Sequence, residues 1–449
     1  MGKGHHIQSA SAAEVGASPW LSFEAQIPRV APRFLFKSAF HFLGLYWVFR
    51  AIYQPEGLSL INIAITLLLA VSLGCFATLL VFYRRRPPWA RVSYLTYYYL
   101  FLTSAWFFFV ILRGIELSTA QLFTLVANPR VGGVVWLLPL AAFIGAREGA
   151  FGSLMSVARV HMVVGAALLI WFFLQTMTAA IDSTMLYDVA LALMYGIPLV
   201  LLLGVGSRGD RYLAYGALII YIIGAFLLSR RAPFAVGILF LIVSVCLGYR
   251  DSTKRIVRRA LVLGFGLVLV GPLAFGLVIG SLPQEWFFDT RSFLWLEMTG
   301  ALSGWDWIMG RGALGTYYSP YFEHALEMGR EGDWMIRQSV EVGYLFIALK
   351  AGLIGVALYC FGLALTMWRA IKLVDVRFGM GVLAYFAIQV AEGFVIGKPE
   401  FIMQYIAQWI LIGVVLSLPV RQRGGAGERY KTRMRPGHYF SPPSSGLRW

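Results

Sequence analysis

Apolar runs of about 20 residues recur along this 449-residue chain, and they limit its possible folds more than any other feature. A helix of that length crosses the hydrocarbon core of a bilayer. Hydrophobic residues make up 59% of the chain, charged residues only 13%, and the mean hydropathy is +0.71. A soluble domain of this size could not bury so much apolar surface in one core. The sequence therefore predicts an all-α, polytopic membrane protein.

The apolar pattern predicts about twelve transmembrane helices, at 34–54, 58–83, 92–112, 131–146, 160–180, 185–205, 212–229, 232–249, 260–281, 340–367, 377–397 and 401–420. With this topology, 27 of the 38 Lys and Arg residues fall on the side of the N-terminus, ten fall opposite, and Lys350 lies within a span. Because cytoplasmic loops are enriched in basic residues, both termini are expected in the cytoplasm. The net charge of +16 is then a topology signal, supported by anionic lipid, and nucleic acid is not an expected partner.

Five segments follow from this topology. A cytoplasmic N-terminal segment (1–33) without an apolar signal-peptide core precedes nine helices (34–281), an external loop (282–338) and three further helices (339–420). A basic tail rich in Gly and Pro (421–449) has the composition of a disordered cytoplasmic segment.

The external loop is the only long connection, with 57 residues, eight carboxylates and four arginines. A loop this long in a compact protein is typically functional. Its aromatic and polar side chains favour a glycan-binding surface, and location in the membrane interface belt is the alternative. The candidates are Trp305, Trp307, Tyr317 and Arg337, with Tyr344 and Glu392 beyond the loop. The stretch "DTRSFLWLEMTGAL" predicts a short amphipathic helix within the loop.

Several kinds of chemistry lack their motifs in this sequence. There is no G-x-x-x-x-G-K-[ST] loop, no kinase signature, no H-E-x-x-H and no His/Cys cluster with the spacing of metal ligands. The three cysteines lie in separate apolar runs and suggest neither a disulfide framework nor a metal site. No cofactor and no metal ion are therefore expected.

Arginines on the external side are the first candidate site. Arg230 and Arg231, in "LSRRAPF", lie at the external end of a helical hairpin, against the usual distribution of basic residues. Arg291 and Arg311 are on the same side. Guanidinium groups bind phosphate oxygens in a bidentate manner, so this set suits a pyrophosphate at the bilayer surface. Anchoring to lipid headgroups is the alternative.

Carboxylates near the same side are the second candidate site. "SVEVGYLFIALKAGLIGVALY" is apolar throughout but carries Glu341 near its start and Lys350 in its middle. A buried Glu341 could act as a general base. Alternatively, Asp333, Arg337 and Glu341 are spaced four apart, and an early helix start would make them a ladder of ion pairs. His324 and Asp333 are further candidate bases.

Glu392, in "AEGFVIGKPEF", lies near the external end of the eleventh predicted helix. Two interpretations are open for it. It either lines the same external cavity or pairs with Lys398.

Several motifs of the chain occur in the order seen in the O-antigen ligase and Wzy-type polymerase superfamily, which residues 229–360 resemble. They are Ser229-Arg230, Arg291 with Trp295, Gly310-Arg311-Gly312, Glu341-Val342-Gly343-Tyr344-Leu345 and Gly352-Leu353-Ile354-Gly355. Two positions depart from the family pattern. Glu341 stands where ligases have His, and Lys350 replaces the usual acidic residue.

The resemblance implies a GT-C-like, metal-independent, inverting glycosyltransferase in the bacterial inner membrane, with its site facing the periplasm. Its donor would be a glycan on undecaprenyl pyrophosphate, held by Arg230 and Arg291, with Glu341 as general base. An acidic residue at this position resembles the polysaccharide polymerases more than the ligases, so polymerisation is the expected reaction. The alternatives are a ligase that transfers the glycan to lipid A-core and, more distantly, a lipid-linked oligosaccharide flippase. A chain-length regulator and a flippase of the same pathway are the expected partners.

Overall fold

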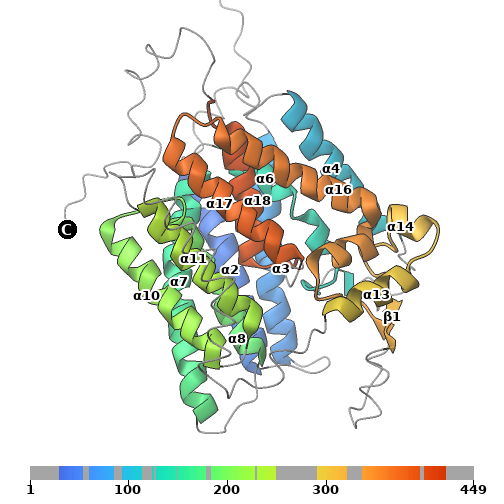
Figure 1. The fold of residues 1–449 in the computed structure, drawn as a ribbon, viewed down its shortest axis with the longest axis horizontal. Coiled ribbons are helices and arrows are strands. Elements are labelled where there is room, and N and C mark those ends of the chain that lie inside the picture. Colours follow the sequence, from blue (N-terminus) through green and yellow to red (C-terminus); the bar gives the residue numbers. More distant parts are fainter. Residues whose placement is uncertain are drawn as a thin grey trace, which may run out of the picture.

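The computed structural model describes residues 30–53, 60–84, 94–113, 124–125, 128–147, 149–177, 184–227, 230–248, 291–320, 336–394 and 399–420. Helices form almost all of this part of the chain, as Figure 1 shows, which confirms the all-α class. The exception is a small antiparallel sheet in which β1 (Tyr317–Tyr318) pairs with β2 (Ile336–Arg337). The predicted span 260–281 and the two terminal segments 1–29 and 421–449 lie outside the described residues.

Seven predicted spans coincide with unbroken helices to within four residues at each end, because each apolar run is a local signal. They are α2 (Val30–Tyr53), α3 (Leu60–Arg84), α4 (Tyr94–Leu112), α10 (Arg208–Leu227), α11 (Arg231–Gly248), α17 (Val376–Gly393) and α18 (Met403–Ser417).

Two predicted spans, 131–146 and 185–205, are each broken into a pair of short helices. The pairs are η2 (Gly133–Leu137) with α6 (Leu140–Gly145), and α8 (Thr184–Leu193) with α9 (Gly196–Leu201). Pro139 lies between η2 and α6, and Pro198 lies in the first turn of α9. Because proline has no backbone N–H and clashes with the preceding turn, a continuous helix cannot pass either position. The prediction of one straight span was wrong for both segments.

The two other predicted spans in the described residues are also helical. The span predicted at 160–180 is α7 (Ala150–Met177), which begins ten residues earlier, and the span at 340–367 is α16 (Gly343–Ile371). Four helical stretches in the described residues are long and apolar enough to cross a membrane: Leu60–Phe82, Tyr94–Leu112, Ala150–Leu174 and Gly343–Ile371. The membrane-protein character expected from composition is thus supported at the level of these four helices.

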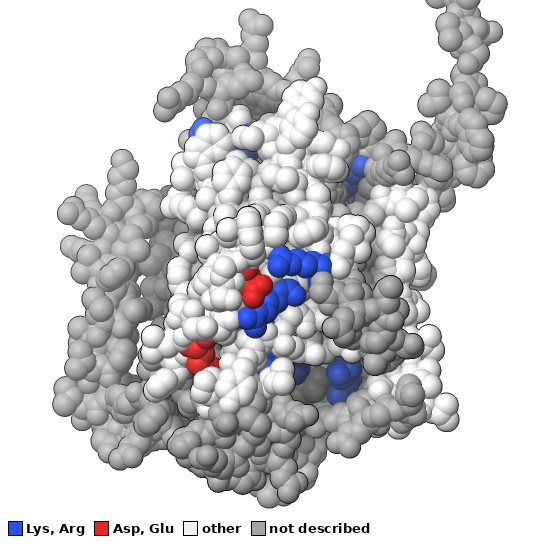
Figure 2. Space-filling model, turned by 90° about the vertical axis from the view of Figure 1, so that its right-hand side faces the viewer, with Lys and Arg blue, Asp and Glu red and all other residues white. Residues whose placement is uncertain are grey.

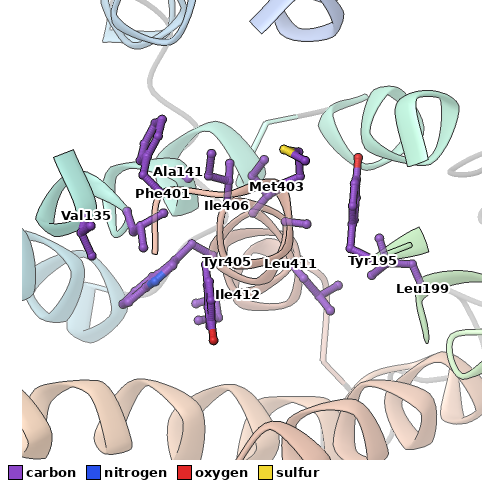
Figure 3. Close-up of a cluster of buried hydrophobic side chains, with 14 of the residues drawn as sticks. Val135, Ala141, Tyr195, Leu199, Phe401, Met403, Tyr405, Ile406, Leu411 and Ile412 are labelled. Atoms are coloured by element: carbon purple, nitrogen blue, oxygen red, sulfur yellow. The ribbon is translucent and has the colours of Figure 1, made fainter. Parts of the chain in front are cut away.

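Helix α18 forms the centre of the core and is buried on nearly all sides. Figure 3 shows it almost end-on, with Val135, Ala141, Tyr195 and other apolar side chains around it. Its contact with α6 is so close that a Cβ on Gly145 or on Gly413 would overlap the backbone of the opposite helix. Small residues allow this approach of two backbones, as they do in membrane helix pairs.

Helix α16 is not straight. Gly352 has φ 68° and ψ −174°, which interrupts the helix after its first nine residues. The interruption brings the ring of Tyr344 to 6.3 Å from the ring of Tyr359, centroid to centroid. In a straight helix, 15 residues would separate these positions by about 22 Å. The first segment of α16 therefore folds back beside the second.

Candidate functional site

The break in α16 is covered by residues 305–316, which include α14 (Trp305–Met309). Neither glycine at this contact could carry a side chain: a Cβ on Gly352 would overlap Ile308 O, and one on Gly310 would overlap the Lys350 carbonyl. A break in a helix leaves carbonyls without their usual N–H partners. At this break, N–H groups from outside the helix donate to these carbonyls instead.

Three consecutive carbonyls of α16 accept these hydrogen bonds. Arg311 N donates to Leu349 O over 2.7 Å, and Gly312 N donates to Lys350 O over 3.0 Å. The indole Nε1 of Trp106, on α4, donates to Ala351 O over 3.1 Å. The loop therefore completes the hydrogen bonding of the interrupted helix.

Lys350 makes the reciprocal contact from the helix to the loop. Its side chain is fully buried, and its Nζ donates to Ala313 O over 2.8 Å and to Gly315 O over 2.6 Å. A buried ammonium is tolerated only when such acceptors compensate for its lost hydration. Lys350 thus ties the loop to the break, and this explains a residue for which the sequence offered no role. We call residues 310–316 and the break at 349–352 the loop clamp.

The side chain of Arg311 also makes its contacts within and beside the loop clamp. Its Nε pairs with Asp306 Oδ2 at 2.9 Å, while Nη1 donates to Thr316 O over 2.7 Å and Nη2 to Ala301 O over 2.5 Å. Arg113, at the end of α4, lies 3.9 Å from the other Asp306 oxygen. Figure 2 shows this side of the molecule, where basic and acidic side chains lie together on a surface with few other charges. The geometry gives Arg311 a structural role.

Glu341 lies in a second group of polar side chains, beside the small sheet. Tyr317 is buried, which raises the pKa of its phenol. The Arg337 guanidinium opposes this shift, and the carboxylates of Glu297 and Glu341 add to it, so all three charges surround Tyr317. Ser319 Oγ donates to Glu297 Oε2 over 2.7 Å. The half-buried Glu341 therefore has a guanidinium in its neighbourhood.

The proposed helical ladder from Asp333 to Glu341 does not form over the described residues. Arg337 ends strand β2, residues 338–342 are bends and extended chain, and α16 begins at Gly343. The pairing of Tyr317 with Arg337 in the sheet holds this segment extended. The rule of four-residue spacing requires a helix. Its use for Arg337 and Glu341 was therefore wrong, whereas their common neighbourhood is real.

Tyr344 joins the start of α16 to the end of α17. Its hydroxyl donates to Val390 O over 3.1 Å, and its ring lies 4.6 Å from that of Phe394, centroid to centroid. This contact brings Glu341, three residues before Tyr344, toward the end of α17 that carries Glu392.

Glu392 lies among neutral polar groups from four helices. Gln389 Nε2 donates to Glu392 Oε2 over 2.7 Å. The charge of Glu392 acts on four phenols, one each from α10, α16, α17 and α18: Tyr221, Tyr359, Tyr385 and Tyr405. Glu392, Tyr221 and Tyr359 are half-buried, whereas Tyr385 and Tyr405 are buried. We call these six residues the Glu392 cluster.

Arg230 lies within electrostatic range of Tyr187, which in turn lies within electrostatic range of the Glu392 cluster. The charge of Arg230 acts on the Tyr187 phenol, and Tyr187 lies within electrostatic range of Tyr221. Arg230 precedes α11 and is exposed. Helix α11, which Arg230 precedes, packs against α17, so a guanidinium and a carboxylate that are 162 positions apart in the sequence lie on neighbouring helices.

The other predicted site residues are placed less completely. His324, Asp333 and Lys398 lie outside the described residues, and Arg231 and Arg291 begin α11 and α13 (Arg291–Ala301) with side chains that are not described. Trp305 is exposed on α14, whereas Trp307 is half-buried against the core. Helix α13 confirms the short helix expected in the loop. It buries Leu294 and Met298 and exposes Leu296.

Sequence reasoning did not identify the tyrosines of the Glu392 cluster or Tyr187. Tyrosines are frequent in the apolar runs, and nothing local distinguishes these five from the others. Glu392 itself was detectable, because a carboxylate near the end of an apolar run is costly and therefore informative.

Comparisons with known proteins give no relatives: no protein-family model, no curated protein and no solved structure matches this chain. Within the described ranges, no three His, Cys, Asp or Glu side chains are grouped so that they could hold a metal ion. The chemistry of the site must therefore be argued from its own residues.

Proposed function

We propose that this chain is a membrane-embedded glycosyltransferase that joins oligosaccharide repeats, carried on undecaprenyl pyrophosphate, into a polysaccharide. The observation that supports the proposal is the packing of α11, which Arg230 precedes, against α17, which carries Glu392 near its end. A guanidinium binds phosphate, and a carboxylate with phenols beside it binds sugar hydroxyls. The presence of both kinds of group on neighbouring helices supports transfer from a lipid pyrophosphate.

The pyrophosphate would be bound by Arg230 and Arg291, as the sequence resemblance implies, together with Arg231. Arg311 is not part of this set in the proposal, because its guanidinium is used within the loop clamp. The acceptor hydroxyl attacks the anomeric carbon of the donor while the lipid pyrophosphate departs on the opposite face. Arginines stabilise the leaving charge, and the configuration at that carbon inverts.

The proposed setting is the bacterial inner membrane, with about twelve helices, cytoplasmic termini and the site on the periplasmic side. The basic residues of alternate loops support this orientation. The base that receives the acceptor proton is one of the titratable side chains on that side. The family resemblance favours Glu341, and His324 and Asp333 are further candidates. A chain-length regulator and a flippase of the same pathway remain the proposed partners.

The test is to incubate the purified full chain with its lipid-linked repeat as the only substrate and to separate the products on a gel. We expect a ladder spaced by one repeat, which is lost in Arg230→Ala and in Arg291→Ala. Arg208→Ala is the matched control. Arg208 is exposed at the beginning of α10, whereas Arg230 lies beyond the other end of that helix. The loss of Arg208 should therefore leave the ladder intact.

Two results would contradict polymerisation. Product formed only after addition of lipid A-core would identify a ligase. Movement of the lipid-linked repeat across liposomes without any new glycosidic bond would identify a flippase.

A further inference from the structure

We propose that Glu392 is the catalytic residue that receives the proton of the acceptor hydroxyl, and that the Glu392 cluster binds the acceptor sugar. The inference rests on the proposed glycosyl transfer. It goes beyond that proposal by assigning the base to a residue outside the motifs that carry the family resemblance.

The first argument is the availability of the carboxylate. Gln389, one turn earlier on α17, donates to Oε2 and fixes the orientation of the group. Within the part of the chain that the structure describes, Glu392 makes no ion pair and has no second hydrogen-bond donor. It is also half-buried rather than enclosed. In the proposal, the acceptor hydroxyl binds to the other oxygen of this carboxylate.

The second argument compares Glu392 with the other carboxylates near the external loop. Asp306 is paired with Arg311, and Glu297 accepts the Ser319 hydroxyl. Glu341 shares its neighbourhood with the Arg337 guanidinium. A nearby cation stabilises the charged form of a carboxylate and so weakens it as a proton acceptor. Glu392 is surrounded by an amide and phenols instead, and these groups do not neutralise it.

The third argument is the composition of the surroundings. Phenol hydroxyls both donate and accept hydrogen bonds, and phenol rings stack on the apolar faces of sugars. Tyr221 and Tyr359 are half-buried like Glu392. Gln408 Nε2 donates to the Tyr359 hydroxyl over 3.0 Å and orients it. This combination suits a hydroxyl-rich ligand.

The proposed step is balanced in atoms and electrons. The acceptor O–H bond breaks, its proton passes to Glu392, and the oxygen forms the new glycosidic bond to the anomeric carbon. The bond from that carbon to the phosphate oxygen breaks, and its electron pair leaves with the lipid pyrophosphate on the Arg230 side. Glu392 then releases its proton to water.

The experiment measures the initial rate of ladder formation against the concentration of lipid-linked repeat. General-base catalysis contributes roughly 10²–10⁴-fold, so Glu392→Gln should lower kcat by at least about 100-fold. KM should change by less than about threefold, because the amide keeps the shape and most of the hydrogen bonds. Glu392→Asp, which retains a carboxylate, should recover part of the rate.

The matched control is Asp375→Asn, at the other end of the same helix. Asp375 caps α17 by accepting from Phe378 N over 3.0 Å, so this change tests the loss of a carboxylate from α17 without touching the cluster. Its kcat should equal that of the wild type. Elution volume and melting temperature show whether each variant is folded. If Glu392→Gln does not fold, the inference is tested with Glu392→Asp, whose kcat should be at least about tenfold below that of the wild type.

Two outcomes overturn the inference separately from the proposed function. If Glu392→Gln keeps more than a tenth of the wild-type kcat, or changes only KM, then Glu392 is not the base, although the polymerase stands. If Glu341→Gln abolishes turnover while Glu392→Gln does not, the base is Glu341. If the wild-type chain forms no glycosidic bond with any acceptor, the proposed function itself is wrong.

Discussion

Replacement of Lys350 by methionine tests the loop clamp directly. Methionine fills a similar volume and keeps the apolar stem but has no donor for Ala313 O and Gly315 O. A buried carbonyl that loses its donor costs about 1–3 kcal/mol, so two cost about 2–6 kcal/mol. Methionine also avoids the cost of burying an ammonium, which places the net loss at about 2–4 kcal/mol.

This loss should be local. It opens residues 310–316 from the break in α16, and at about 1.4 kcal/mol per factor of ten it raises the open population roughly 30- to 700-fold. Hydrogen–deuterium exchange reads this population at the amides of Arg311, Gly312 and Ala313. These amides donate to Leu349 O, Lys350 O and Val110 O in the closed state.

The control is Lys372→Met, at the C-cap of the same helix. Lys372 is exposed, and its ammonium lies 3.3 Å from the centroid of the Trp368 ring, a contact worth about 0.5–1 kcal/mol. The Lys372→Met variant should leave hydrogen–deuterium exchange at residues 310–316 unchanged. If Lys350→Met alters exchange at these three amides by less than threefold, Lys350 does not hold the loop and the reasoning is refuted.

Three further predictions concern the helix break, a helix cap and metal ions. Gly352→Ala forces a residue with a side chain into the left-handed region and places its Cβ against the backbone of α14. Thermal unfolding should show that it lowers the stability of the protein by about 3 kcal/mol or more. The control Gly300→Ala, in open space on α13, should be neutral or slightly stabilising. Asp210→Ala removes the 2.6 Å bond from Ser207 N and the 2.8 Å ion pair with Arg159, and the same measurement should show a loss of about 1–2 kcal/mol. Ladder formation should continue in EDTA at the wild-type rate, and activity that disappears in EDTA and returns with magnesium would contradict the metal-independent mechanism.

The sequence predicted the helices well where the signal is local. The span at 58–83 became α3, and the span at 92–112 became α4, because an apolar run and its polar ends are contained in one stretch. Pro139 and Pro198 were visible signals of the two broken spans. Their effect was underestimated because the hydropathy of each run is continuous.

The loop clamp could not be predicted in the same way. An isolated glycine in an apolar helix is usually tolerated, so Gly352 alone did not indicate a break. The break is stabilised by Arg311, Gly312 and Trp106, which lie 38 to 245 residues away from their acceptors. Lys350 likewise acquires its role only from carbonyls of another segment. Contacts of this kind depend on the packed structure and leave no periodic pattern.

The loop clamp also sets an order in which the chain can mature. Translation produces Trp106 first, Arg311 and Gly312 next, and the carbonyls of 349–351 last. When the first segment of α16 leaves the ribosome, every donor that its interrupted backbone needs has already been made. A helix at membrane depth cannot leave such carbonyls facing lipid. The segments that supply these donors are therefore complete before the interrupted part of α16 is synthesised.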